Sequence, residues 1–329
     1  MEELTLHLSS KKSKAVFLTF VIAVSGIAFL GSAESFAHSK VNYHEQSYTV
    51  TNGQSFNRLL GDFEISFYNK LLLKTFIKIN GLNLAQAGHY NIEDLSWRTF
   101  LKSIDIGAVK IYKFEIIPGS NLYDLEALIK NSNLTHDCKN FNCLDNRYKF
   151  IEGTLKPDTY FYKHLSPVSS VLKKSQKEFF KTSNNLWRKR HPDNPLQSLS
   201  DAIILASIVE KEAGNDNEKP MIAGVFLHRL ALDMKLQADP TIIYGLLPDF
   251  NGDITKANLR DKNNSYNTYQ IPSLPPTPIS SISQSSLEAV ILGVANEYLY
   301  FVANGRGAHD FSRTYKEHLK AVKRYQLNQ

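Results

Sequence analysis

The segment SDAIILASIVEKEAG, residues 200–214, contains the acidic side chain best placed for chemistry. Ser200 is suited to cap the start of a helix, and Gly214 is suited to end it. The apolar residues of this helix recur along one face, and Glu212 takes the next position on that face, whereas Glu210 points to roughly the opposite side. The apolar face consists of Leu205, Ile208 and Val209. We therefore expect Glu212 to extend a buried face into an adjoining cleft.

A carboxyl group at this position experiences two effects of the same sign. Burial disfavours its anion, and so does the negative end of the helix dipole. Both raise its pKa toward the range in which a carboxyl acts as a general acid near neutral pH. The alternative is a structural role, in which Glu212 lies in solvent at the helix end or pairs with Lys211 or Lys219.

Two later segments combine tyrosines with amide and carboxylate groups, which suits sugar rings with apolar faces and polar edges. The first is KLQADPTIIYGL at 235–246, and the second is SYNTYQIPSLPPTPI at 265–279. The alternative is a structural role, because loops whose aromatic side chains only pack inside the protein would show the same pattern. The candidate substrate-binding residues are Gln237, Asp239, Tyr244, Tyr266, Asn267 and Tyr269.

Other chemistries lack their motifs. The sequence has no GxSxG elbow, HExxH, P-loop or glycine-rich dinucleotide fingerprint. His309, in the glycine-rich stretch GRGAHDF, is a single histidine of a kind that is seldom a metal ligand or a base. We expect neither a metal nor a cofactor.

The elements that position these residues follow an apolar N-terminal stretch. AVFLTFVIAVSGIAFLGSA, from Ala15 to Ala33, is uncharged and has about the length needed to cross a bilayer. Three lysines precede it, at positions 11, 12 and 14, which predicts a cytoplasmic N-terminus and an exported remainder. A cleaved signal peptide is the alternative, because Ser35-Phe36-Ala37 has small residues suited to a signal peptidase. The length of the run favours the uncleaved anchor.

The net charge of +6 and the pI of about 9.0 raise the question of nucleic acid. Exported proteins do not normally meet nucleic acid, and the basic residues here are scattered, so we expect a solvated surface that tolerates an anionic membrane and cell wall. Cys138 and Cys143 stand close together in CKNFNC. An oxidising compartment permits a small disulfide loop between them, although geometry can also forbid it.

The patterns divide the chain into residues 1–14, a span at 15–34, a linker at 35–47, a small α/β unit at 48–113 and a mixed α+β unit at 114–329. Periodicity predicts helices and strands in both units. The expected helices are 55–60, 69–79, 122–130, 166–190, 200–213, 219–232 and 315–325, and the expected strands are 48–50, 89–92, 109–114 and 298–302.

Six ordered motifs resemble the endolytic murein transglycosylases of the MltG (YceG-like) family, over roughly 45–325. They are EGTLKPDTYFY at 152–162, ASIVEKEAG at 206–214, AGVFLHRL at 223–230, MKLQADPTIIYG at 234–245, YNTYQIPSLPPTPI at 266–279 and YLYFVANGRGAHDF at 298–311. This sequence departs from the family pattern at His228, where asparagine is usual, and at Asp233, where glycine is frequent. The turn at Pro118-Gly119 also lacks a glutamate that many members carry.

The resemblance implies a single-pass inner-membrane lyase with a LysM-like module ahead of a YceG-like catalytic domain, and it makes Glu212 the catalytic residue. It also implies cleavage between N-acetylmuramic acid and N-acetylglucosamine that leaves 1,6-anhydro ends and terminates nascent strands. The implied partners are glycan strands, the inner membrane and peptidoglycan synthases, with no nucleic acid. Two alternatives remain open. One is a hydrolytic muramidase with Asp239 or Asp158 as a second carboxylate, and the other is a non-catalytic wall-binding scaffold.

Overall fold

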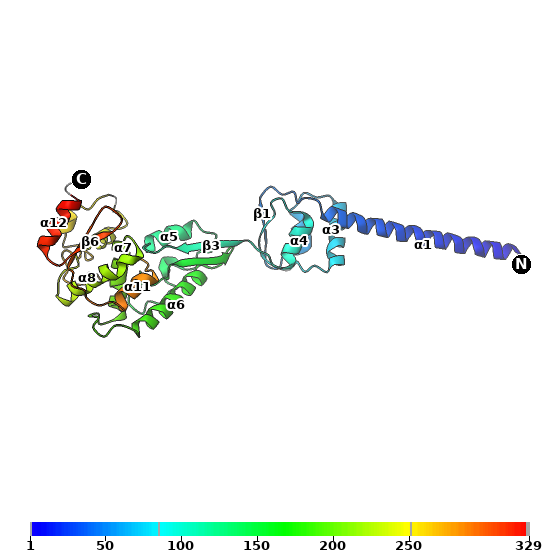
Figure 1. Ribbon diagram of the computed structural model, residues 1–329. Helices are drawn as coiled ribbons and strands as arrows, with labels where there is room; N and C mark the ends of the chain where they lie inside the picture. Colours follow the sequence, from blue (N-terminus) through cyan, green and yellow to red (C-terminus); the bar gives the residue numbers. More distant parts are fainter. Residues whose placement is uncertain (1, 85, 251, 327–329) are drawn as a thin grey trace. The chain divides into compact units, whose positions relative to one another are not determined.

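The computed structural model describes residues 2–84, 86–250 and 252–326. The chain divides into two compact units, Met1–Tyr112 and Lys113–Gln329, which are treated separately below. Each unit has its own hydrophobic core, and Figure 1 shows the elements of both. The architecture is mixed α+β.

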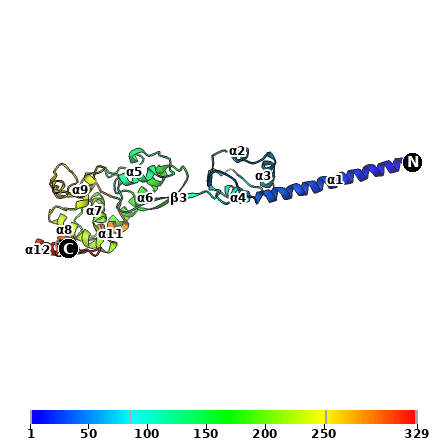
Figure 2. The ribbon, with the colours of Figure 1, turned by 90° about the horizontal axis from the view of Figure 1, so that it is seen from above.

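Unit 1 begins with the long helix α1 and continues as a strand, two helices, a second strand and a further helix. The bounds are α1 Glu2–Ala37, β1 Ser47–Val50, α2 Phe56–Gly61, α3 Phe67–Asn80, β2 Gly88–Asn91 and α4 Trp97–Asp105. From Ser13 to Ala37, α1 is long and apolar enough to cross a membrane, with a mean hydropathy of 2.2. Figures 1 and 2 show that most of α1 extends away from the compact part of the unit.

An aromatic core holds the compact part of unit 1 together. Strands β1 and β2 pair antiparallel, with Tyr48 opposite Tyr90. Both rings are buried together with Phe63, Trp97 and Phe100. The core also includes the residues that follow α1, because buried Val41 donates its backbone N–H to the Leu95 carbonyl and Tyr43 packs on Tyr48. The segment predicted as a linker is therefore packed onto the module rather than standing free.

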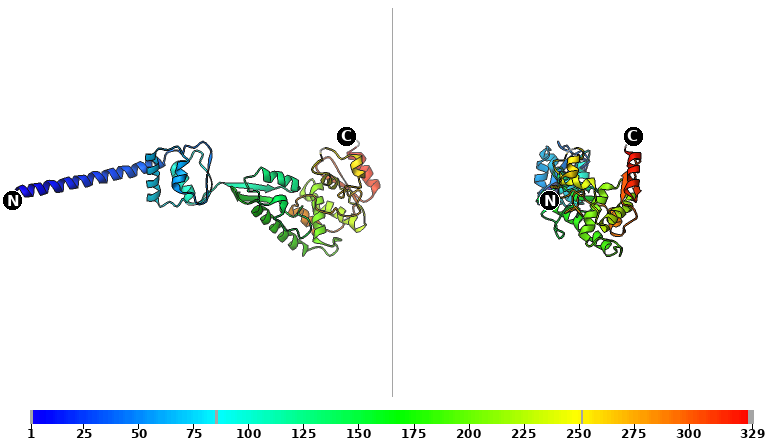
Figure 3. Two further views of the ribbon diagram at one scale, coloured as in Figure 1. Left: turned by 180° about the vertical axis from the view of Figure 1, so that it is seen from behind. Right: turned by 90° about the vertical axis from the view of Figure 1, so that its left-hand side faces the viewer.

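Unit 2 consists mainly of helices with two small sheets. Its helices are α5 Leu122–Lys130, α6 Val168–Trp187, α7 Leu199–Glu212, α8 Lys219–Ala231, α9 Asp239–Gly245, α10 Lys256–Arg260, α11 Gln284–Ile291 and α12 Tyr315–Tyr325. Strand β3, Ile111–Ile116, pairs with β4, Asp158–Lys163, and β5, Tyr300–Ala303, pairs antiparallel with β6, His309–Ser312. Helix α12 packs on the β5–β6 hairpin, and Figure 3 shows both from behind.

Helix α7 is the central element of unit 2, in contact with α6, α8, α9 and α11. Every residue from Ala202 to Val209 is buried, so the apolar surface surrounds the helix instead of forming the single predicted face. The predicted cap was wrong by two positions. Ser198, not Ser200, caps α7, because Asp201 completes a capping box with Ser198. The helix ends at Glu212 with Ala213 in an extended conformation, so Gly214 is not its cap.

A disulfide joins Cys138 and Cys143, whose Cα atoms lie 5.2 Å apart, which answers the question that the sequence left open. Asp233 adopts the left-handed conformation with φ of 53°, which Asp tolerates better than most residues. The departure from glycine at this position therefore keeps the turn before Met234. His228, the other departure in this region, binds the Tyr298 carbonyl through its ring at 3.1 Å.

Candidate active site

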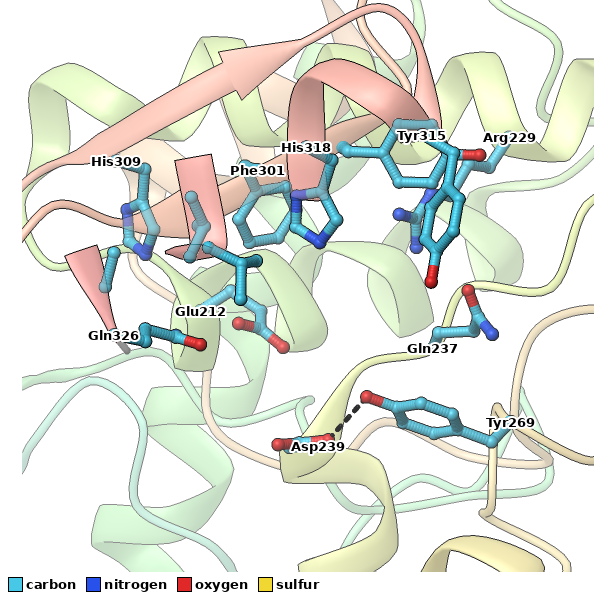
Figure 4. Close-up of a pocket in the computed structure, with 14 residues that line it drawn as sticks. Glu212, Arg229, Gln237, Asp239, Tyr269, Phe301, His309, Tyr315, His318 and Gln326 are labelled. Carbon is cyan, nitrogen blue, oxygen red and sulfur yellow. Dashed lines mark hydrogen bonds between the residues drawn. The ribbon is translucent and has the colours of Figure 1, made fainter. Parts of the chain in front are cut away.

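A cavity of about 500 Å³ opens at the C-terminal end of α7. Its walls come from the last residue of α7, the last turn of α8, the start of α9, strands β5 and β6, and helix α12. Figure 4 shows the labelled side chains converging on this space. The residues used in the argument below are Glu212, Arg229, Gln237, Asp239, Tyr269 and His309.

Glu212 is the last residue of α7, and its carboxyl group faces the cavity (Figure 4). Its side chain is half-buried, and the core of unit 2 packs around the preceding turn of the helix. Burial raises the pKa of Glu212 to about 7, and repulsion from Asp239 adds to the rise, whereas Arg229 opposes it. Within the described residues no hydrogen bond reaches the carboxyl group. Glu212 is therefore an acid that titrates near neutral pH, and its carboxyl group is free to meet a ligand.

Arg229, on α8, supplies the positive charge of the cavity. Its side chain is buried, and its guanidinium donates hydrogen bonds to the carbonyls of Leu299, at 2.7 Å, and Leu236. The guanidinium also lies 5.5 Å from the centre of the Tyr300 ring. Arg229 thus ties strand β5 to the segment before α9, while its charge favours the anionic form of Glu212.

Three predicted substrate-binding residues line the cavity, namely Gln237, Asp239 and Tyr269. Gln237 has a left-handed backbone with φ of 49°, held by its N–H bond to the Thr268 carbonyl at 3.2 Å. The Tyr269 hydroxyl donates to Asp239 Oδ1 at 2.7 Å, which Figure 4 marks with a dashed line. The backbone of Gln237 and the hydrogen bond between Tyr269 and Asp239 hold the polar groups of these three residues along one wall of the cavity.

The other three predicted residues have structural partners and do not belong to the described cavity lining. The Tyr244 hydroxyl donates to Glu152 at 3.0 Å, and the Tyr266 hydroxyl bonds Thr277 at 2.7 Å. Asn267 is fully buried, and its amide donates to the carbonyls of residues 258, 259 and 261. Their polar groups are thus used inside the protein, and their role in substrate binding stays a prediction.

Glu210 belongs to a buried polar network away from the cavity. Its carboxylate pairs with Lys219 at 3.3 Å and accepts hydrogen bonds from Ser283 and Ser286, at the start of α11. Lys219 therefore pairs with Glu210 rather than with Glu212, and Lys211 donates to the Gly119 carbonyl at 3.2 Å. The ion pair with Lys219 that was considered for Glu212 is thus made by Glu210, two residues earlier.

Sequence reasoning assigned no role to several residues that line the cavity. His309, on β6, contacts Glu218 through Nδ1 at 3.1 Å, and its backbone N–H donates to the same carboxylate at 2.6 Å. Figure 4 shows the ring of His309 at the edge of the space above Glu212. Tyr315 and His318 come from α12. His309 lies within the motif at 298–311, which was the signal in the sequence that pointed to it. Its partner Glu218 is distant in sequence, so only the fold brings the two side chains together.

Comparison with known proteins identifies relatives of this chain. Residues 48–324 match the model of the YceG-like family. An endolytic murein transglycosylase of Bacillus subtilis is 32% identical over 179 residues, which cover 53% of this chain and 48% of that protein. One from Streptococcus pneumoniae is 29% identical over 187 residues, covering 53% and 33%. The alignments thus span about half or less of these relatives.

A solved structure is also similar. The crystal structure of a yceG-like protein from Listeria monocytogenes superposes with a TM-score of 0.55 and 26% sequence identity. The superposition covers 84% of this chain and 98% of that one.

Proposed function

This chain belongs to the YceG-like family, and from that premise we propose that it is an endolytic peptidoglycan lytic transglycosylase, a lyase anchored in the bacterial inner membrane. One observation carries the proposal. Glu212, with its pKa raised to about 7 and its carboxyl group free of hydrogen bonds within the described residues, faces a cavity lined by polar and aromatic side chains. A buried acid in such a cavity is suited to protonate a glycosidic oxygen.

The proposed reaction needs only one carboxyl group. Glu212 donates its proton to the oxygen between N-acetylmuramic acid and N-acetylglucosamine, and the bond from that oxygen to the muramoyl anomeric carbon breaks. The resulting carboxylate then accepts the proton of the muramoyl C6 hydroxyl, whose oxygen attacks the same anomeric carbon. The products are a 1,6-anhydroMurNAc end and a new GlcNAc end, and no water is consumed.

The other cavity residues have supporting roles in this scheme. Repulsion from Asp239 adds to the effect of burial in raising the pKa of Glu212, which favours the protonated acid at the start. Arg229 stabilises the carboxylate that exists after the first proton transfer. Gln237 and Tyr269 are placed on one wall to hydrogen-bond sugar hydroxyls. Glu210 and Asn267 act by holding the surrounding elements in place.

The proposed setting is the outer face of the inner membrane. Helix α1 is the single span, with its N-terminus in the cytoplasm. Support for an uncleaved anchor comes from Ala33 and Ala37, which are buried, and from the helix that continues through Ser35–Ala37. Unit 1 is proposed to be a LysM-like module that docks glycan, and the enzyme is proposed to terminate nascent strands beside peptidoglycan synthases.

Digestion of purified peptidoglycan tests the reaction. The parent protein should release fragments with 1,6-anhydro ends, identified by mass. Glu212→Gln should slow release by roughly 100-fold or more, the contribution of a general acid. Asp158→Asn is the matched control, because Asp158, considered above as a second carboxylate, is exposed on β4, pairs with Lys156 at 3.3 Å and does not belong to the described cavity lining. Undiminished cleavage by the Glu212→Gln protein would reject the proposal.

A hydrolytic muramidase is the second candidate, because Asp239 lines the same cavity as Glu212. Two carboxyl groups in one site permit attack by water. The same digest decides between the candidates, since hydrolysis leaves reducing ends in place of anhydro ends. A wall-binding scaffold without activity would leave both the parent and the Glu212→Gln protein unable to release fragments.

A further inference from the structure

The end of α1 forms part of the compact core of unit 1. Ala33 and Ala37 are 1% and 0% exposed, and α1 packs along α3. Farther toward the N-terminus, the Phe29 ring meets the Tyr68 ring edge-on, with centroids 6.3 Å apart. Figure 1 shows α3 on the side of the module from which α1 extends. The module is therefore attached to the apolar helix through packed contacts at several positions.

The position of these contacts along α1 sets their depth. The uncharged run from Ala15 to Ala33 is about 28 Å long at the helical rise, close to the thickness of a hydrocarbon core. Glu34, the next residue, pairs with Arg98 of the module. Phe29 precedes the end of the run by about one helical turn, roughly 6 Å. Tyr68, which contacts Phe29, must then lie at or just below the boundary between hydrocarbon and headgroups.

The first turn of α3 is apolar on the side that the module leaves uncovered. Phe67, Tyr68 and Leu71 are 84%, 54% and 42% exposed, while Leu72, Leu73 and Phe76 of the same helix are buried in the core. Lys70 and Lys74 supply cationic groups on the same helix. Aromatic rings flanked by lysines are typical of protein segments that lie in the interfacial layer of a bilayer.

We propose that the first turn of α3 inserts into the outer interfacial layer of the membrane that α1 spans, so that the module is held rigidly against the bilayer surface. The inference rests on the proposed role of α1 as a membrane span. The contact between Phe29 and Tyr68 indicates that the bilayer covers the exposed apolar patch of Phe67, Tyr68 and Leu71. Phe29 belongs to the membrane span, so this contact places the patch at the depth of the lipid. The glycan-docking unit would then stay close to newly made strands.

Tryptophan scanning of the full-length protein in lipid vesicles tests the proposal. Phe67→Trp places a reporter in the patch, and Ile79→Trp places a matched one at the far end of α3, where Ile79 is 59% exposed. Both carry Trp97→Phe and Trp187→Phe, so that each has a single reporter. We expect Phe67→Trp to emit at shorter wavelength, to be quenched by lipids brominated near the headgroup and to lose quenching by aqueous iodide. Ile79→Trp should remain quenched by iodide.

A third reporter separates failure of the inference from failure of the anchor. Val21→Trp, in the middle of the apolar run, should be quenched by lipids brominated deep in their chains. If it is quenched while Phe67→Trp is as accessible to iodide as Ile79→Trp, the span holds and the interfacial contact is refuted. If Val21→Trp is not quenched, both the anchor and the contact are wrong.

Discussion

Replacing Glu212 by glutamine should stabilise the protein at high pH and leave its stability unchanged at low pH. The native pKa of Glu212 lies at about 7, raised from 4.5 mainly by burial. Between these values the folded protein binds a proton that the unfolded chain has released, so the free energy of unfolding falls as the pH rises through this window. Glutamine is neutral at every pH, so the Glu212→Gln protein does not lose this part of its free energy of unfolding as the pH rises.

The magnitude follows from the two pKa values. A rise from 4.5 to about 7 corresponds to about 3 kcal/mol, and this is an upper value because the opening to the cavity admits water that screens the charge. At pH 8 the Glu212→Gln protein should therefore exceed the parent by up to about 3 kcal/mol. At pH 4, below both pKa values, the two proteins should agree.

Urea unfolding of the full-length protein in detergent measures this difference. Trp97→Phe in both proteins leaves Trp187, on α6 of unit 2, as the fluorescent reporter. Glu152, whose pKa burial also raises to about 7, is present in both and cancels in the difference. Asp158→Asn removes an exposed carboxylate and should produce no such gain. A Glu212→Gln gain that is absent, or equal at pH 4 and pH 8, would refute the reasoning.

Three further outcomes are expected. The rate of glycan release should fall as the pH rises through about 7, since Glu212 must be protonated, and Asp239→Asn should move that fall to lower pH in a pH–rate profile. Lys219→Met leaves Glu210 buried without its cation and should cost about 3–5 kcal/mol in urea unfolding. Asn267→Ala deprives three carbonyls of a donor and should lower stability by about 1–3 kcal/mol, with kcat/KM unchanged below its unfolding temperature.

Local patterns predicted much of the secondary structure. Helix α5 lies where the spacing placed it, as does α12, and the strand predicted at 48–50 is part of β1. Helix α4 was missed although Trp97, Phe100, Leu101 and Ile104 recur at helical spacing. The helices α9 to α11 were missed because segments of five to eight residues are too short to show a clear period. The cap of α7 was misplaced because Ser198 and Ser200 both stand where the helix begins, and only the reciprocal bond between Ser198 and Asp201 distinguishes them.

The site was harder to predict than the fold. Helical periodicity was enough to place Glu212 at a buried helix end and Glu210 on another side. It gave no means to separate Tyr269, which faces the cavity, from Asn267, which lies two residues earlier and whose amide donates to backbone carbonyls. Arg229 reaches the site only because α8 packs beside α7. Such contacts between distant segments are set by tertiary packing, which no local pattern encodes.

The most direct test follows the Glu212 carboxyl group itself. Glutamate labelled with ¹³C at the side-chain carboxyl carbon gives a spectrum in which the signal absent from the Glu212→Gln protein belongs to this residue. Its chemical shift should titrate with a midpoint at about pH 7, as burial and Asp239 require. A midpoint near the ordinary glutamate pKa of about 4.3 would mean that the group is ionised at neutral pH, which would contradict the proposed role of Glu212 as a general acid.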